Sequence, residues 1–260
     1  TCTVVLLPQQ LSLRSAPLAT LLEIVQAYAS RCSFDVWATH TTLAADALCR
    51  LGQFYAAVHV YRAVLARVAP SADKRQVLVD GVPVADASVA SKFVPTLSHY
   101  IRAMQGFSVA SASAARAYDA QCDAASTVRR LLRALNMLQS SAALVLEQAL
   151  PLREAMYHHI FNASVYTLTI GEALMQSQAA FARLPLPFLS FAILSLERTA
   201  TLSAPKFLPW RLQLYGCLTR AYDRAGVVAL TPFVTKPTVQ EAAADTMAGG
   251  KGKANVSQCG

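Results

Sequence analysis

Apolar residues recur every three or four positions along most of the chain, a spacing typical of amphipathic helices. The last such segment runs from Pro209 to Ala225. Its proline suits the first turn of a helix, and Gly226 suits the left-handed residue that ends one. The spacing predicts a helix with one broad buried face, made of Leu212, Tyr215, Leu218 and Tyr222.

The same periodicity predicts a series of earlier helices. The first follows Ser15, a candidate N-cap for an apolar stripe that extends to Tyr28. The others are predicted at Phe93–Phe107, Ser113–Leu138, Ser141–Leu150, Pro151–Phe181 and Pro187–Thr199. Trp210 is expected to be largely buried against the last of these, Pro187–Thr199. The sequence therefore predicts an all-α fold.

One segment, Thr39 to Pro70, resembles a tetratricopeptide repeat in its second half. In such a repeat a glycine closes the turn between two helices, an alanine lets them approach, and an aromatic residue and a leucine fill the groove. Its first half, Thr41–Leu48, lacks the usual tryptophan, so the repeat is degenerate. The match predicts stacked helical hairpins, an α-solenoid, and it depends on Gly52, Phe54, Ala57, Tyr61, Leu65 and Pro70.

The helical pattern breaks between residues 71 and 92. Val77 and Val79 alternate with polar or smaller neighbours, and Asp80–Gly81 is a favoured two-residue turn. Pro83 would keep a hairpin at the edge of a sheet. A short β-hairpin and a plain surface loop both remain open.

The polar, proline- and glycine-punctuated stretch from Thr231 is typical of a flexible linker. The predicted organisation is a helical repeat region over 1–70, a loop or hairpin over 71–92, a second helical region over 93–226, and a flexible linker or insertion over 227–260.

The composition is rich in apolar residues and poor in charged ones, which predicts binding partners. Hydrophobic residues make up 54% of the chain and charged residues 15%, below the roughly one quarter usual in soluble domains. A membrane does not explain this excess, because no run of about twenty apolar residues is present. We therefore expect burial against other proteins or against more of the same chain.

The first residues and the cysteines indicate a compartment and the extent of the polypeptide. No secretory signal is present, and six cysteines are scattered without a C-x-x-C motif, which predicts reduced thiols in a cytosolic compartment. Because the first residue is Thr1 rather than methionine, we interpret the sequence as a piece of a longer polypeptide.

Candidate catalytic residues are few. Glu154 and His158 stand one helical turn apart, but no third metal ligand follows at a suitable spacing, and a plain polar pair is favoured. Cys49 with His59, or Cys217 alone, lacks a nameable base or oxyanion donor. No phosphate-binding glycine loop precedes a helix. The sequence predicts no enzyme, no cofactor and no metal.

The charge balance favours acidic partners. Lys and Arg number 23 against 15 acidic residues, a formal charge of +8, which suits nucleic acid, anionic lipid or the acidic tails of tubulin. Arg129, Arg130 and Arg133 concentrate this charge on one helix. A solvated helix face is the simpler interpretation, and a binding patch is the functional one. Nucleic acid ranks low because no aromatic residues are interleaved with these arginines.

The stretch from Phe161 to Asp223 resembles the cilia- and flagella-associated protein 54 family. The likeness lies in Asn162, Tyr166, Leu174, Leu196, Glu197, Lys206, Leu208, Trp210, Arg211, Leu214, Tyr215 and Tyr222. It implies a helical, repeat-bearing scaffold in the central apparatus of motile cilia, on a projection beside one central-pair microtubule.

The resemblance also implies partners and a location. The partners would be other central-apparatus projection proteins in a large hetero-complex, with tubulin as a further contact at the arginines, and the location would be the axonemal cytoskeleton. In the family an alanine- and arginine-rich helix closely follows the last one. Here the stretch from Thr231 intervenes, which predicts an insertion and a pairing helix beyond Gly260.

Two functions remain open from the sequence. One is an axonemal scaffold, and the other is a general tetratricopeptide-type adaptor unrelated to cilia. Capture of a peptide carboxylate needs convergent Lys, Arg and Asn, and the matched repeat offers only Arg62 and Arg67.

Overall fold

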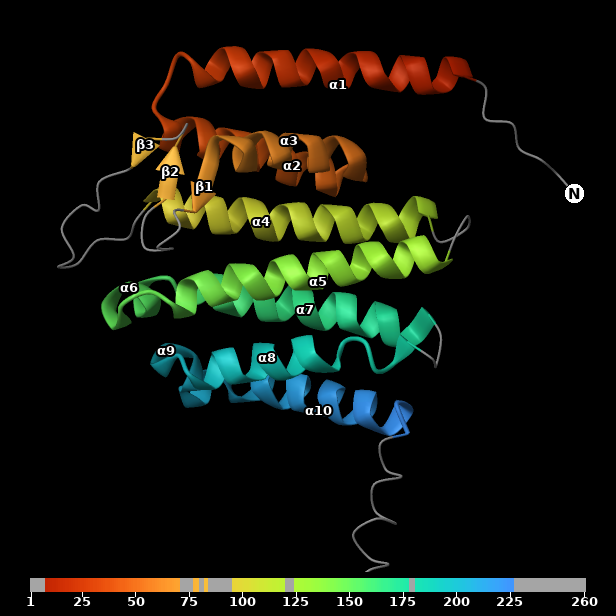
Figure 1. Ribbon diagram of the computed structural model, residues 1–260, viewed down its shortest axis with the longest axis vertical. Coiled ribbons are helices and arrows are strands. Elements are labelled where there is room, and N and C mark those ends of the chain that lie inside the picture. Colours follow the sequence, from red (N-terminus) through yellow and green to blue (C-terminus); the bar gives the residue numbers. More distant parts are fainter. Residues whose placement is uncertain are drawn as a thin grey trace, which may run out of the picture.

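The computed structural model describes residues 8–70, 77–79, 82–83, 95–119, 124–177 and 181–226. Its helices lie side by side and follow one another along the long axis of the molecule (Figure 1). The upstream helices are α1 (Pro8–Ala29), α2 (Phe34–Arg50), α3 (Phe54–Arg67), α4 (Pro95–Ala114) and α5 (Ala124–Leu146), with a π-helical turn η1 (Ala115–Asp119) after α4. The downstream helices are α6 (Leu150–Ala155), α7 (Tyr157–Ser177), α8 (Leu186–Glu197), α9 (Ala200–Ser203) and α10 (Leu208–Arg224), with a short 3-10 turn at Pro205–Phe207.

Each long helix packs mainly on its neighbours in the chain. Helix α3 packs between α2 and α4, α5 between α4 and α7, and α8 between α7 and α10. The predominantly helical architecture expected from the 3.6-residue periodicity is confirmed over the described residues.

A small antiparallel sheet interrupts the helices, in the order β1 (Val68–Pro70), β2 (Val77–Val79), β3 (Val82–Pro83). Strands β2 and β3 pair with Val79 opposite Val82, the register of the predicted hairpin, and Pro83 lies on an edge strand. Strand β1 is not predicted by the sequence pattern, in which Pro70 marks the end of the repeat. Asp80, Gly81 and Val84 lie outside the described residues.

The α2–α3 turn closes at a glycine. Gly52 has φ +73, a left-handed conformation that glycine adopts without strain. Ala57 is fully buried and Tyr61 is 2% exposed. Helix α2 begins at Phe34 rather than Thr39, and this longer first helix brings in Trp37, which is 1% exposed and donates its indole N–H to the Val25 carbonyl at 2.8 Å.

Several predicted helix boundaries are wrong. Helix α1 begins at Pro8, so Ser15 lies inside it and is not its cap. The predicted break before Ser141 is absent, because the Ser140 and Ser141 hydroxyls bond to carbonyls of their own helix, Asn136 at 3.0 Å and Leu138 at 2.7 Å. Serine in that arrangement is compatible with a continuous helix. The helix predicted from Pro151 instead breaks at the buried Met156, between α6 and α7.

Helices α3 and α4 approach closely where α4 carries a glycine. A Cβ atom placed at Gly106 would lie 2.3 Å from the Tyr61 ring, inside the distance of any ordinary contact. Because the Tyr61 ring is buried, it has little room to move. Gly106 therefore sets the packing distance between these two helices.

The buried face of α10 differs from the predicted one. Leu214, Cys217 and Ala221 are fully buried, whereas Leu218 is half-buried. The other members of the predicted stripe are exposed: Leu212 by 59%, Tyr215 by 43% and Tyr222 by 42%. Helix α10 packs on α7 and α8 through the Leu214 face, and its flanking arginines reach the same two helices. Arg211 binds Glu197 at 2.7 Å and Arg220 binds Glu172 at 3.1 Å.

Trp210 is half-buried rather than largely buried, and it contacts a different helix from the one expected. Its indole N–H donates to the Ser164 hydroxyl at 2.9 Å, and its ring lies 5.7 Å from that of Phe161. Both partners are on α7, so the tryptophan joins α10 to α7 instead of to α8.

Candidate partner-binding surfaces

The pair considered for metal binding has another role. Glu154 accepts hydrogen bonds at 2.9 Å from the backbone N–H groups of Ala200 and Thr201, and so caps α9. Burial would raise the pKa of Glu154, but these bonds and one from the Thr201 hydroxyl lower it below its ordinary value. The ring of His158 packs on that of His159. Over the described residues no group of three or more metal-ligating side chains comes together.

The candidate thiols are poorly suited to nucleophilic chemistry. Burial and the nearby Asp46 raise the pKa of Cys49 to about 11. Burial also raises the pKa of Cys217, which is 0% exposed. Because the thiolate is the reactive form, both groups stay protonated and inert near neutral pH. His59 is exposed on α3.

A buried polar cluster, which sequence reasoning did not find, joins α4, α5 and α7. The His159 Nε2 atom lies 2.8 Å from the Ser98 hydroxyl, and the Gln105 amide donates to the His159 carbonyl at 2.8 Å and to the Ser141 hydroxyl at 3.3 Å. The pKa of His159 is lowered to about 3, mainly by burial and further by the positive charges of His158, Arg102 and His99. The cluster is enclosed, since His159 is 3% exposed, and its role is structural.

A second polar group centres on Asp46 and joins α2, α3 and α4. Its carboxylate accepts a short hydrogen bond from the Tyr61 hydroxyl and another at 2.8 Å from Arg102. Burial and the Asp46 carboxylate raise the pKa of Tyr61 well above its ordinary value. The hydroxyl therefore stays a hydrogen-bond donor. Tyr61 thus has two roles, filling the groove and orienting Asp46 toward Arg102.

The three arginines singled out in the sequence do lie together on α5. At 3.6 residues per turn they occupy about 100° of the helix circumference. Arg129 and Arg133 are exposed, and Arg130 is half-buried. Arg130 donates a hydrogen bond to the Tyr55 hydroxyl at 3.3 Å, and its guanidinium lies 5.9 Å from the centre of that ring. This contact places the beginning of α5 beside the beginning of α3.

A fourth arginine extends this surface along α3. Arg62 lies two helical turns after Tyr55 and so faces the same side of α3, with its guanidinium 5.8 Å from the centre of the Phe107 ring on α4. We define the arginine surface as Arg62, Arg129, Arg130 and Arg133. Tyr55, Arg62 and Phe107 were not predicted as part of it, because they come from other helices.

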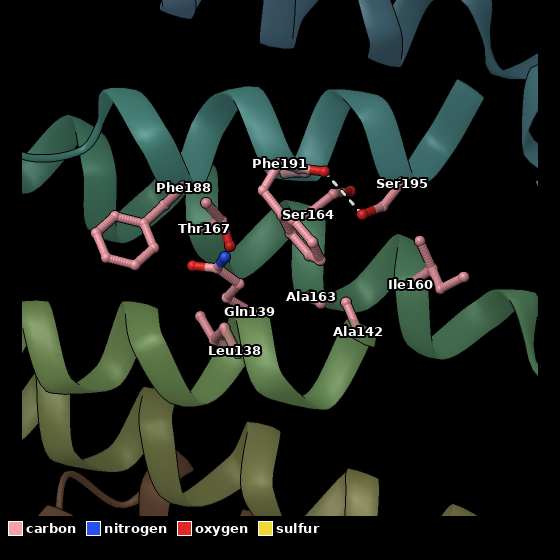
Figure 2. A pocket seen from close by; sticks show the side chains of 11 residues that line it. Leu138, Gln139, Ala142, Ile160, Ala163, Ser164, Thr167, Phe188, Phe191 and Ser195 are labelled. Atoms are coloured by element: carbon pink, nitrogen blue, oxygen red, sulfur yellow. Dashed lines mark hydrogen bonds between the residues drawn. The ribbon is translucent and has the colours of Figure 1, made fainter. Parts of the chain in front are cut away.

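The cavity between α5, α7 and α8 is too small for a ligand (Figure 2). Its volume of about 10 Å³ is at the limit for a single water molecule. Two hydroxyls that line it are satisfied by their own helices: Ser195 donates to the Phe191 carbonyl and Ser164 to the Phe161 carbonyl, each at 2.7 Å. The cavity is a packing defect rather than a small-molecule site.

The outer face of α10 is a second surface. We define the α10 stripe as Leu208, Leu212, Tyr215 and Tyr222, whose exposed fractions run from 42% to 59%. Helix α10 lies at the end of the stack (Figure 1), and large apolar groups exposed together in this way are typical of contact surfaces. A search of the described residues finds no helix with the length and hydrophobicity needed to cross a bilayer.

The chain is similar to known ciliary proteins. The family model described as "Cilia- and flagella-associated protein 54" matches residues 12–230, which extends far upstream of the stretch from Phe161 to Asp223. Cilia- and flagella-associated protein 54 of Chlamydomonas reinhardtii is 33% identical over 119 residues, which are 46% of this chain and 4% of that protein. The matched part of the chain thus spans a small fraction of its relative.

Proposed function

Because the chain belongs to the cilia- and flagella-associated protein 54 family, we propose that it is a structural scaffold of the axoneme, located on a projection of the central-pair microtubules. The match over residues 12–230 carries this proposal. Family membership supports association with cilia and flagella, and the placement on a central-pair projection is the further step.

The architecture proposed for the scaffold is an α-solenoid of tetratricopeptide-like helix pairs. The helices stack on their sequence neighbours, and the α2–α3 pair has the glycine turn and the buried Ala57 and Tyr61 of such a repeat. In a solenoid each pair leaves a face for the next one to cover. The exposed α10 stripe fits an internal or partner-covered end of that kind.

The proposed partners are other proteins of the same projection, held in a large hetero-complex. The chain offers two chemically different surfaces for them. The α10 stripe is apolar, and the arginine surface is cationic and suits acidic proteins, of which tubulin is one.

Imaging and motility measurements test the scaffold proposal. Loss of the protein should leave cilia assembled but beating abnormally, and averaged images of the axonemes should lack density in one central-pair projection. A tagged copy should label the axoneme along its length. Label confined to the cytosol or nucleus of a ciliated cell would refute the scaffold and favour the general adaptor.

A further inference from the structure

We propose that the arginine surface on α3 and α5 binds an extended, glutamate- or aspartate-rich segment of a partner protein. The inference deepens the proposed function by assigning a partner chemistry to one surface. It rests on the proposed function only for where the partner would be located, which is the axoneme.

The first support is the charge pattern of the helices that carry the surface. Helices α3, α4 and α5 themselves contain no Asp or Glu. Within the described part of the chain, Arg129 and Arg133 are exposed and form no ion pair. Other arginines differ, since Arg102, Arg211 and Arg220 bind Asp46, Glu197 and Glu172. Exposed guanidinium groups such as those of Arg129 and Arg133 attract anionic groups and carry bidentate donors for carboxylates.

The second support is that two of the four guanidinium groups are held in place before any partner arrives. Arg62 lies over the Phe107 ring and Arg130 over the Tyr55 ring, an arrangement that orients a guanidinium group. The Tyr55 hydroxyl fixes Arg130 further. Less side-chain freedom is lost on binding when donors are held in this way.

The third support is the distribution of the four arginines over more than one helix. Arg129 and Arg133 are one turn apart on α5, and Arg62 lies on α3, on the other side of α4. A chain that contacts all of them must cross helices, which an extended peptide can do. Nucleic acid is less suitable, because both rings are already covered by guanidinium groups and are not free to stack with bases. A membrane is less suitable because the exposed stripe that continues Arg129 and Arg133 is polar, with Asn136 and Ser140.

Anisotropy measurements with a fluorescein-labelled peptide of alternating glutamate and glycine test the proposal. The chain should bind the peptide, and raising the salt to about 1 M should abolish binding because the Debye length then falls to about 3 Å. Arg129→Glu with Arg133→Glu should weaken binding by roughly tenfold or more. Both side chains are exposed, so the helical circular dichroism should be unchanged.

The matched control reverses the charge of two exposed arginines outside the arginine surface, as Arg31→Glu with Arg198→Glu. It changes the net charge equally and should leave peptide binding nearly unaffected. Equal weakening by both double variants would overturn the proposal, because binding would then follow net charge alone. Tighter binding of a single-stranded oligonucleotide or of phosphatidylserine vesicles, lost in the first variant only, would overturn it in favour of those partners.

This outcome is separable from the scaffold proposal. If the peptide does not bind while tagged protein still labels the axoneme, the acidic segment is refuted and the scaffold stands. If the peptide binds but the axoneme is unlabelled, the surface stands and the scaffold is refuted.

Discussion

Arginines have different roles in the two halves of the stack. In α7 to α10 they hold helices together: Arg211 and Arg220 bind acidic residues on α8 and α7, and Arg183 and Arg224 bind the backbone carbonyls of Ala225 and Met175. In the upstream half Arg102 on α4 also pairs with Asp46, but Arg62 and Arg130 lie over aromatic rings and Arg129 and Arg133 are exposed. The same residue type therefore holds helices together in one half and, on α3 and α5, leaves exposed charge in the other.

The halves also differ in how their helices pack. Upstream, contact is steric and aromatic, with the Tyr61 ring placed against Gly106. Downstream, α10 packs through the small and apolar side chains of Leu214, Cys217 and Ala221. Substitutions of matched chemistry should therefore have different effects in the two halves.

The largest effect is expected at the buried face of α10. Leu214→Ala should lower the free energy of unfolding by about 2–5 kcal/mol, because Leu214 is fully buried. Leu212→Ala, on the exposed α10 stripe, should change it by no more than about 0.5 kcal/mol. Urea unfolding followed by circular dichroism measures both. Similar losses at the two positions would mean that Leu212 is buried in solution as well as Leu214.

The next effect is expected at the close approach upstream. Gly106→Ala should destabilise the chain by about 1–3 kcal/mol, as overpacking does, because the new Cβ would meet the Tyr61 ring. Gly216→Ala is the matched control on α10, where a Cβ meets nothing within 4 Å. It should be stabilising by about 0.5–1 kcal/mol. A higher melting temperature for Gly106→Ala would show that α3 and α4 are not held at this distance.

A third effect is expected at the polar cluster between the halves. His159 has a folded-state pKa of about 3 and an ordinary value of 6.5. The unfolded chain therefore binds a proton that the folded one excludes. Stability is complete above pH 6.5 and falls with pH below it, by as much as about 1.4 kcal/mol per pH unit. Burial also lowers the pKa values of His99 and His158, which steepens the fall.

The pH effect is measured by urea unfolding at a series of pH values. His159→Gln should flatten the dependence between about pH 6.5 and 5, whereas the exposed His59→Gln should leave it unchanged. If the two variants have the same slope as the unsubstituted chain, the proton is not excluded by this cluster.

The smallest effect is expected at a surface ion pair downstream. Arg220→Ala should cost about 0.2–1 kcal/mol, since its side chain is 60% exposed and that of Glu172 is 37% exposed. The loss should shrink as salt is added. Arg133→Ala, upstream, is the control and should leave stability unchanged at every salt concentration. A loss at Arg133 as large as at Arg220 would remove the distinction between the halves.

The sequence predicted the helices well because their periodicity is local, and it predicted the wrong face of α10 for a related reason. Two stripes with the same spacing overlap there, one through Leu212 and Tyr215, the other through Leu214 and Cys217. Hydrophobicity favours the first, but packing against α7 and α8 buries the second. Which stripe is buried is decided by neighbouring helices.

The site was predicted only where its residues are adjacent in the chain. Arg129, Arg130 and Arg133 form a local cluster that any reader of the sequence would notice. Tyr55 lies 75 residues before Arg130, and nothing in the spacing connects them. The His159 cluster likewise depends on three helices meeting, so its signal exists only in the folded chain.

The crossed helix caps have a mechanical consequence. Glu154 binds the start of α9, while Arg183 and Arg224 bind the last carbonyls of α10 and α7, and these contacts lie at opposite ends of the downstream helices (Figure 1). Helices α7 and α10 are themselves joined near both ends of α10, by Trp210 to Ser164 and by Arg224 to Met175. Sliding of one helix along the other would load these bonds in shear, so they would have to break together, and this half should resist bending.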